Sequence, residues 1–314
     1  MRKSANPHND AQQWLLQGDP AIRWQVLCDL TSASTKRIKQ ERRKVASEGW
    51  GARLLKMQDA AGTWGRGLYT PKWTSTTYTM LLLRDFGLPH SHPQAQRACA
   101  LLLDKGLRGD GGINFGKHDE SETCITGMVL SILSHFRYRG PSVDTVVEHL
   151  LAEQMPDGGW NCRRSRGATH SSMNTTISAL EALHQYEINF RRKLRDVRAA
   201  QERAREFLLI HSLFRSHRTG KVIRPEFMRL VYPPRWHFDI LRALDYFRAV
   251  SAPRDRRLSD AIEVVRKARR ADGLWSIDYQ YAGPTHFQLE KRGAPSRWNT
   301  LRAMRVLKWW EGNF

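Results

Sequence analysis

Several patterns that would fix the class of this 314-residue chain are missing from it. The first residues, MRKSANPHNDAQQW, contain no apolar segment of the kind that a secretory signal needs. No run approaches the roughly 18 apolar residues of a membrane-spanning helix. No stretch of about six residues alternates between apolar and polar side chains, so no half-buried β-strand is indicated. We therefore expect a soluble, cytoplasmic, helical protein.

Cysteine and acidic residues are also in short supply. The four cysteines, at positions 28, 99, 124 and 162, show no CxxC spacing, so the sequence predicts neither a disulfide framework nor a zinc knuckle. Lysine and arginine number 51 against 31 aspartates and glutamates, which gives a net charge of +20. Such an excess indicates an anionic partner, for example a diphosphate, a nucleic acid or an acidic polysaccharide. The alternative is a solvated basic surface that only keeps the protein soluble.

What the chain does contain is a repeated pair, a basic residue followed by tryptophan, at the head of an apolar segment. The pairs are Arg23-Trp24, Lys72-Trp73, Arg235-Trp236 and Arg297-Trp298. A proline stands two to four residues before each tryptophan, and proline favours the first turn of a helix. If Thr123 and Met173 hold the matching positions between the second and third pairs, the series is 24, 73, 123, 173, 236 and 298. Its steps of 49, 50, 50, 63 and 62 residues predict a repeat protein.

Each repeat is expected to be a helical hairpin joined by a glycine-rich turn. The first, more charged helices are expected at residues 8–17, 38–58, 93–105, 143–154, 194–211 and 258–270. The second, more apolar helices are expected at residues 21–31, 73–86, 121–136, 171–186, 236–250 and 296–310. Six such hairpins can bury their apolar helices by closing into a ring. We predict one all-α domain over residues 1–314, an α6/α6 toroid whose inner helices line a central cavity.

Three turn segments carry a resemblance to a known family. LLKMQDAAGTWG (54–65) and HLLAEQMPDGGW (149–160) match the glutamine-tryptophan repeat of squalene and oxidosqualene cyclases, and VVRKARRADGLW (264–275) is a weaker copy without the glutamine. DGGINF and DGGWN are similar to segments that lead into the inner helices of protein prenyltransferase β subunits. The chain thus resembles the terpenoid cyclase/protein prenyltransferase superfamily. The resemblance implies the toroid, an enzyme of the transferase or isomerase class, and an isoprenoid substrate.

The same resemblance implies structural clamps at three tryptophans, Trp64, Trp160 and Trp275. It does not carry over a catalytic motif, because neither D-x-D-D nor D-D-x-x-D occurs in the chain. The toroid is also similar to polysaccharide lyases and inverting glycosidases, and a fold does not fix a chemistry.

A metal site is suggested by Glu122-x-Cys124 followed by His170, which is similar to the zinc-binding Asp-x-Cys and His of the prenyltransferase β subunits. Carboxylate, thiolate and imidazole suit Zn²⁺ with an open fourth position, and Mg²⁺ is the other candidate cofactor. The pattern departs from the family, since Cys124 stands close to Gly127 and the family's His falls nearer Asn174. The alternative is an acidic first helical turn with a buried cysteine.

Ring closure would bring the four basic residue–tryptophan pairs to one mouth of the toroid, beside helix N-termini that favour anions. The expected substrate-binding residues are Arg23, Lys72, Arg235 and Arg297 for a diphosphate, Trp73, Trp236 and Trp298 for an isoprenoid chain or a developing carbocation, and Asn174 and Asn299. The alternative is that each tryptophan wedges neighbouring hairpins together and each cation caps a turn.

Acid–base chemistry is expected from Asp239, His237 or Glu122. Asp239 is the strongest of the three, because a carboxyl group in an aromatic pocket has a raised pKa and can hold a proton at neutral pH. The alternative is an ion pair between Asp239 and Arg242 or Arg235.

Two other function classes fit the same sequence. A lyase or hydrolase of an anionic polysaccharide would use His237, His170 or Tyr78 as base and would need an open cleft. A non-enzymatic basic toroid would bind nucleic acid with an affinity that falls steeply with salt. Its contacts would be Arg191, Arg192, Lys193, Arg195 and Arg198 on one outer helix and the run from Lys36 to Lys44.

Overall fold

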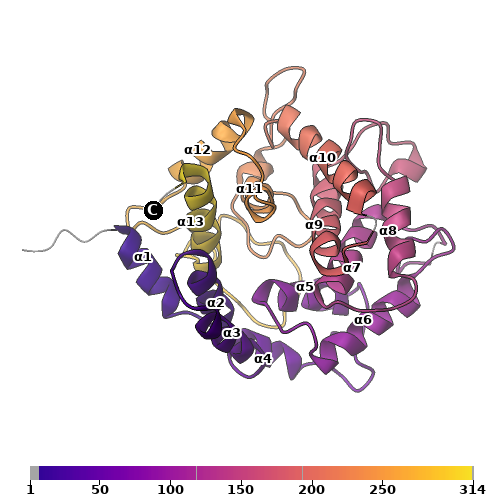
Figure 1. Cartoon of the computed structure of the whole chain (residues 1–314), viewed down its shortest axis with the longest axis horizontal. Helices are drawn as coiled ribbons and strands as arrows, with labels where there is room; N and C mark the ends of the chain where they lie inside the picture. Colours follow the sequence, from indigo (N-terminus) through magenta and orange to yellow (C-terminus); the bar gives the residue numbers. More distant parts are fainter. Residues whose placement is uncertain (1–6, 118, 193, 313–314) are drawn as a thin grey trace, which may run out of the picture.

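The fold, seen in a computed structural model that describes residues 7–117, 119–192 and 194–312, is all-helical and forms a ring of helical hairpins (Figure 1). The inner helices are α2 (Pro20–Asp29), α5 (Thr76–Phe86), α7 (Thr123–His135), α9 (Met173–Phe190), α11 (Ile240–Ala249) and α13 (Arg297–Glu311). The outer helices are α1 (Pro7–Leu16), α3 (Thr35–Arg43), α4 (Gly49–Leu55), α6 (Pro93–Gly106), α8 (Val143–Ala152), α10 (Leu194–Ile210) and α12 (Ser259–Lys267). Short 3₁₀ turns lie at Lys44–Ala46, Arg164–Arg166, Pro225–Met228 and Arg256–Leu258. The predicted all-α toroid is confirmed.

The ring closes because the last inner helix returns to the beginning of the chain. Helix α13 packs against α1 and α2 on one side and against α11 on the other (Figure 1). The closest helix pair is α7 with α9, and Gly127 of α7 permits it, since a Cβ atom there would lie 3.1 Å from the backbone nitrogen of Ala179. No helix within the described residues is long and apolar enough to cross a membrane.

Two inner helices begin later than the tryptophan pattern predicts. Helix α5 starts at Thr76 and α11 at Ile240, so Lys72-Trp73 and Arg235-Trp236 lie in the loops that precede them. The start of α11 is set by Asp239, whose side chain accepts a hydrogen bond of 2.7 Å from the Arg242 backbone N–H. An aspartate that caps a helix in this way satisfies an N–H group that has no partner inside the helix.

Three tryptophans in the turns act as clamps of identical design. The indoles of Trp64, Trp160 and Trp275 are fully buried. Each indole N–H donates to the carbonyl of the residue ten positions earlier, at 2.6 Å, 2.7 Å and 2.7 Å; the acceptors are Leu54, Leu150 and Val265. Each clamp therefore fixes the end of an outer helix to the turn that follows it.

The same turns are fixed to the inner helices by a repeated threonine. The backbone N–H groups of Trp64, Trp160 and Trp275 donate to threonine hydroxyls at 3.0–3.1 Å, and Ile113 does so at 2.9 Å in the unit without a tryptophan. The acceptors are Thr76, Thr126, Thr176 and Thr300. This register corrects the sequence alignment by one residue in the sixth unit, where Arg297, and not Trp298, is equivalent to Met173.

The glutamine of the repeat links its turn to the next outer helix. Gln154 donates to the Gly158 carbonyl at 2.6 Å and to the Ala200 carbonyl of α10 at 2.8 Å, and Gln58 makes the equivalent pair of bonds. In the third copy Arg269 replaces the glutamine and donates to the Gly273 carbonyl at 3.0 Å. The clamp is therefore kept where the sequence motif is incomplete.

We predict that Trp160→Phe lowers the free energy of unfolding by about 2 kcal/mol, because the buried Leu150 carbonyl loses its donor. Urea denaturation measures the change. Trp310→Phe, at a half-buried position near the end of α13, serves as the control and should change it by less than about 0.5 kcal/mol. Equal effects of the two substitutions would contradict the clamp.

Candidate functional site

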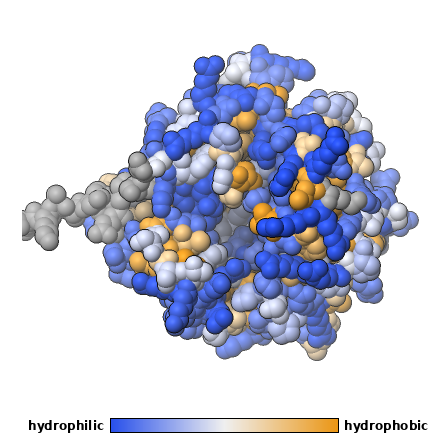
Figure 2. All heavy atoms as spheres, viewed as in Figure 1, coloured by the Kyte–Doolittle hydropathy of each residue, from blue (hydrophilic) through white to orange (hydrophobic). Residues whose placement is uncertain are grey.

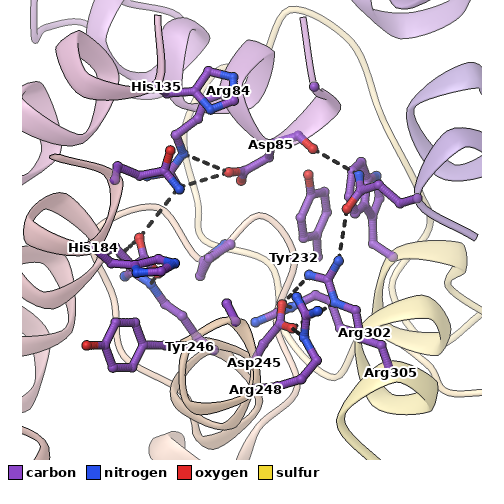
Figure 3. A pocket seen from close by; sticks show the side chains of 18 of the residues that line it. Arg84, Asp85, His135, His184, Tyr232, Asp245, Tyr246, Arg248, Arg302 and Arg305 are labelled. Atoms are coloured by element: carbon purple, nitrogen blue, oxygen red, sulfur yellow. Dashed lines mark hydrogen bonds and ion pairs between the residues drawn. The ribbon is translucent and has the colours of Figure 1, made fainter. Parts of the chain in front are cut away.

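A cavity of about 250 Å³ lies at the centre of the ring, where inner helices face one another (Figure 3). The face drawn in Figure 2 is largely hydrophilic and is hollowed near the centre of the ring. The charged residues on the cavity wall are Arg84, Asp85, Glu181, Arg242, Asp245, Arg248, Arg302 and Arg305. The rings on the wall are those of Trp24, His135, His184, Tyr232, Tyr246 and Trp298. The cavity wall thus combines aromatic rings with charged groups of both signs, and among the predicted binding residues only Trp298 lines it.

One half of the cavity wall is joined by ion pairs that centre on Glu181 of α9. Its carboxylate lies 2.7 Å from Arg242 of α11 and 3.5 Å from Arg84 of α5. Arg84 also donates to the Ser131 hydroxyl of α7. Three inner helices are therefore linked through one partly buried carboxylate, and Arg84 adds α7 as the fourth.

The other half is joined through Asp245 of α11. Arg305 of α13 donates to this carboxylate at 2.7 Å and to the Gln25 side chain of α2 at 2.9 Å (Figure 3). Gln25 in turn donates to the Asp85 carbonyl of α5 at 3.0 Å. With the Glu181 contacts, these bonds form a closed circle of side-chain interactions around the cavity.

The two central carboxyl groups are charged despite their burial. Burial alone would raise both pKa values, but the neighbouring guanidinium groups outweigh it. Arg242 and Arg84 lower the pKa of Glu181. Arg305 and Arg248 lower the pKa of Asp245 to about 2. Both groups are therefore anionic at neutral pH.

The imidazoles on the wall are neutral. Burial, with Arg84 nearby, lowers the pKa of His135 to about 3, and burial also lowers the pKa of His184. The charge on the wall is then that of five arginines against three carboxylates, a surplus of two positive charges.

Two residues of the wall carry a buried hydrogen-bond donor that has no partner among the described residues. The donors are the Tyr232 hydroxyl and the Trp298 indole N–H, whose side chains are 4% and 2% exposed. The two rings are stacked, with centroids 4.3 Å apart and planes inclined by 13°. A buried donor without an acceptor costs about 1–3 kcal/mol, so this stack favours a ligand that brings acceptors.

The four cations predicted to meet at one mouth belong to two separate groups. Arg23 is bound to Glu41 at 2.6 Å and to the Gly18 carbonyl at 2.8 Å. Arg297 lies over the Trp14 ring at 4.3 Å. These two therefore lie near the junction of α1 and α2 with α13, and both have partners within the protein.

The second group lies in the loops before α5 and α11. Lys72 stands 5.9 Å from the ring centroids of both Trp73 and Trp236, and the Arg235 guanidinium stands 5.2 Å from that of Trp73. Arg235 contributes to a small space that also borders Arg84, so it lies next to the central cavity. Its Nη1 atom is buried without a partner, and burial lowers its pKa to about 10. Of the predicted cations, Arg235 is the one beside the cavity.

His237 is held in a stack of rings. Its imidazole lies 3.7 Å from the Trp236 ring centroid and 3.6 Å from that of Tyr281. Burial lowers the pKa of His237 to about 3, with Arg242 and Lys72 contributing. It is a neutral imidazole, and its role as a base remains a prediction.

Asp239 lies behind the cavity wall. One carboxylate oxygen caps α11 and lies 3.7 Å from Arg302, and the other has no partner among the described residues. Burial raises the pKa of this carboxyl group. Asp239 thus has the raised pKa expected of a buried carboxyl group. It also lies beside an arginine, which is Arg302 and not the expected Arg242 or Arg235.

The predicted metal ligands are not assembled into a site. Cys124 Sγ lies 3.9 Å from Glu122 Oε2, whereas the exposed His170 ring contacts Thr169. No group of three or more His, Cys, Asp or Glu side chains in the described part of the chain is placed to hold a metal ion. Glu122 and Cys124 contribute instead to a polar region between α7 and α9.

The two predicted asparagines bind backbone groups. Asn174 accepts from the Phe238 N–H at 2.7 Å, and Asn299 donates to the carbonyls of Leu230 and Ser276 at 3.1 Å and 2.9 Å. Both amides therefore hold the loops that lead into α11 and α13.

Sequence reasoning missed most of the charged wall. A signal was present, because Arg242, Asp245 and Arg248 recur every three residues in one apolar helix and Arg302 and Arg305 do so in another. That spacing places them on one helix face. Charged residues on the buried face of an inner helix indicate a polar cavity.

Comparison with solved structures finds similar chains. A protein from Actinoplanes is 15% identical, with 97% of this chain and 98% of that chain covered and a TM-score of 0.49. Apo type II terpene cyclase MstE from Scytonema is 14% identical, with 85% and 96% covered and a TM-score of 0.37. A variant of the same cyclase in complex with geranylgeranyl dihydroxybenzoate is 13% identical, with 85% and 96% covered and a TM-score of 0.37. No protein-family model and no curated protein matches the chain.

We predict that stability falls as the pH drops from about 4 to 2. The folded-state pKa of Asp245, about 2, lies below its ordinary 3.8, so its contribution is complete above pH 3.8 and is lost as the pH falls through 2. Urea denaturation at pH 7, 4, 3 and 2 measures this loss. Asp245→Asn should cost about 3 kcal/mol at pH 7, because Arg305 keeps only Asp29 as an acidic partner, and should flatten the acid limb. The surface control Asp272→Asn should leave both unchanged; an acid limb as steep in Asp245→Asn as in wild type would refute the assignment.

Proposed function

We propose that the central cavity binds a compact anion that carries an apolar group, and that the protein is an enzyme acting on a short-chain prenyl diphosphate. The observation that carries the proposal is the Tyr232–Trp298 stack, two buried donors without acceptors beside a surplus of arginine.

The charge of the wall supports an anion. Five arginines and three carboxylates line the cavity, and Asp29 and Asp239, which pair with Arg248, Arg305 and Arg302, lie outside that lining. Guanidinium groups bind phosphate oxygens through two parallel hydrogen bonds, and such bonds are strengthened away from bulk water. Arg248 is the most accessible arginine of the Asp245 group, with 23% of its side chain exposed. It is therefore the first candidate for contact with a phosphate.

The aromatic wall supports the apolar part. Trp24, Tyr232 and Trp298 offer π faces on which a short chain can lie. In the proposed reaction the allylic C–O bond breaks and its electron pair leaves with the diphosphate, which the arginines hold. The carbocation faces an indole, and the neutral His184 imidazole accepts the proton that is lost.

The size of the cavity limits the substrate. At about 250 Å³ it is smaller than the roughly 300–1,000 Å³ of pockets for drug-sized ligands, so it fits a diphosphate with a short chain. A polysaccharide chain needs an open cleft. For nucleic acid, Arg192 and Arg198 are paired with Asp144 and Glu187, and Lys193 lies outside the described residues. No observation on the described residues favours either polymer.

Calorimetric titration with geranyl diphosphate, geraniol and inorganic diphosphate tests the proposal. We expect geranyl diphosphate to bind with micromolar affinity, inorganic diphosphate more weakly and geraniol not at all. Tyr232→Phe should weaken binding about tenfold, because the hydrogen bond to a charged acceptor contributes about 1.5 kcal/mol. Arg248→Gln should weaken it further.

Matched controls separate the cavity from the rest of the chain. Tyr186→Phe removes a hydroxyl that already donates to Asp144, and Arg297→Gln removes one of the cations at the ring junction. Both should bind like wild type. Loss of affinity in Arg297→Gln with none in Tyr232→Phe or Arg248→Gln would overturn the cavity as the site.

A further inference from the structure

A second site lies between α7 and α9, away from the central cavity, where two cysteines converge. Cys124 is in the first turn of α7, and Cys162 is in the connector that leads from α8 into α9. The two helices approach closely at Gly127, which brings the start of α7 against the start of α9. The backbone N–H of Cys162 donates to the Thr175 hydroxyl of α9 at 3.3 Å, which fixes the connector there.

The two cysteines border the same carboxylate. Cys124 Sγ donates to Glu122 Oε2 at 3.9 Å, and Glu122 and Cys162 line one pocket. The neighbouring Cys124 thiol lowers the pKa of Cys162 to about 6, and Thr175 acts in the same direction. The same contact, together with burial, raises the pKa of Cys124. One sulfur is therefore a thiolate at neutral pH and the other is the thiol that supports it.

The thiolate is accessible to small molecules. Cys162 lines a pocket of about 540 Å³, with Arg166 on the same connector and Glu122 and Asn114 across from it. Both cysteines are half-buried and neither is in a disulfide. The lining also includes Asp119 and Glu120, so the pocket is polar and suits a hydrophilic reagent.

We propose that Cys124 and Cys162 form a reversible dithiol–disulfide pair that reacts with small-molecule disulfides of the glutathione type. The Cys162 thiolate attacks one sulfur of the reagent, forms a mixed disulfide and releases one glutathione thiolate. Cys124 then gives its proton to Glu122 or water and attacks Cys162 Sγ, which releases the second glutathione. Counted from the dithiol, the protein loses two electrons and two protons, one of them already lost when Cys162 ionises. The reagent becomes two thiols once solvent protonates the released thiolates.

The other two cysteines provide internal references. Cys99 is fully buried, and burial raises its pKa. Cys28 is exposed, but burial of its sulfur and the adjacent Asp29 raise the pKa of its thiol. Neither has a second thiol as partner, so neither can resolve a mixed disulfide within the chain.

Intact-mass spectrometry after treatment with oxidised glutathione at pH 6.5 tests the pair. Wild type should lose the mass of two hydrogen atoms and keep no glutathione, with peptide mapping linking Cys124 to Cys162. Cys124→Ser should stop at a stable glutathione adduct on Cys162. Cys28→Ser should behave like wild type.

Alkylation measures the reactivity of the Cys162 thiol without requiring that a disulfide forms. Iodoacetamide at pH 6.5 should modify Cys162 at least tenfold faster than Cys28, and Cys124→Ala should reduce that ratio because Cys162 loses the neighbouring donor. A persistent adduct on wild type, or equal alkylation rates at Cys162 and Cys28, would overturn the proposal.

Discussion

The closed circle of hydrogen bonds around the central cavity is the constraint on which the rest of this toroid depends. Helices α7 and α9 pack along their length, but α9 and α11 meet mainly through side chains, and Glu181 with Arg242 forms that joint. The ion pair between Asp245 and Arg305 then links α11 to α13. Buried ion pairs add little net stability, since desolvation offsets their attraction. Their effect is positional, because each pair fixes one inner helix against the next.

Frame and cavity come from different parts of the sequence. The frame is built by repetition, in which a tryptophan clamp and a threonine hydroxyl recur at equivalent positions such as Trp160 and Thr176. Part of the cavity wall comes from the region in which the spacing between repeats increases. The two longest repeat steps contain the loop that supplies Tyr232 and the helix that supplies Arg242. A cavity of mixed charge thus replaces the apolar interior that six identical hairpins would leave.

The fold could be predicted because its signals are local. Glycine-rich turns and helical periodicity place the hairpins, and the inner helix boundaries fall within about four residues of expectation. The site could not be predicted in the same way, because it depends on which face of each inner helix points inward. Trp298 was identified from its repeat position and does line the cavity. Arg297, its neighbour in the same motif, points to Trp14 at the ring junction. A difference of one position on the same helix therefore decides whether a side chain lines the cavity or lies at the ring junction.

The central claim is that the Tyr232–Trp298 stack and the arginines around it bind the head of an anionic substrate. The most direct measurement is a crystal structure of the protein with a non-hydrolysable thio-analogue of geranyl diphosphate. We predict density in the central cavity, with phosphate oxygens within hydrogen-bonding distance of the Tyr232 hydroxyl and the Trp298 N–H. Density confined to the loop site of Lys72 and Arg235, with only water in the cavity, would contradict it.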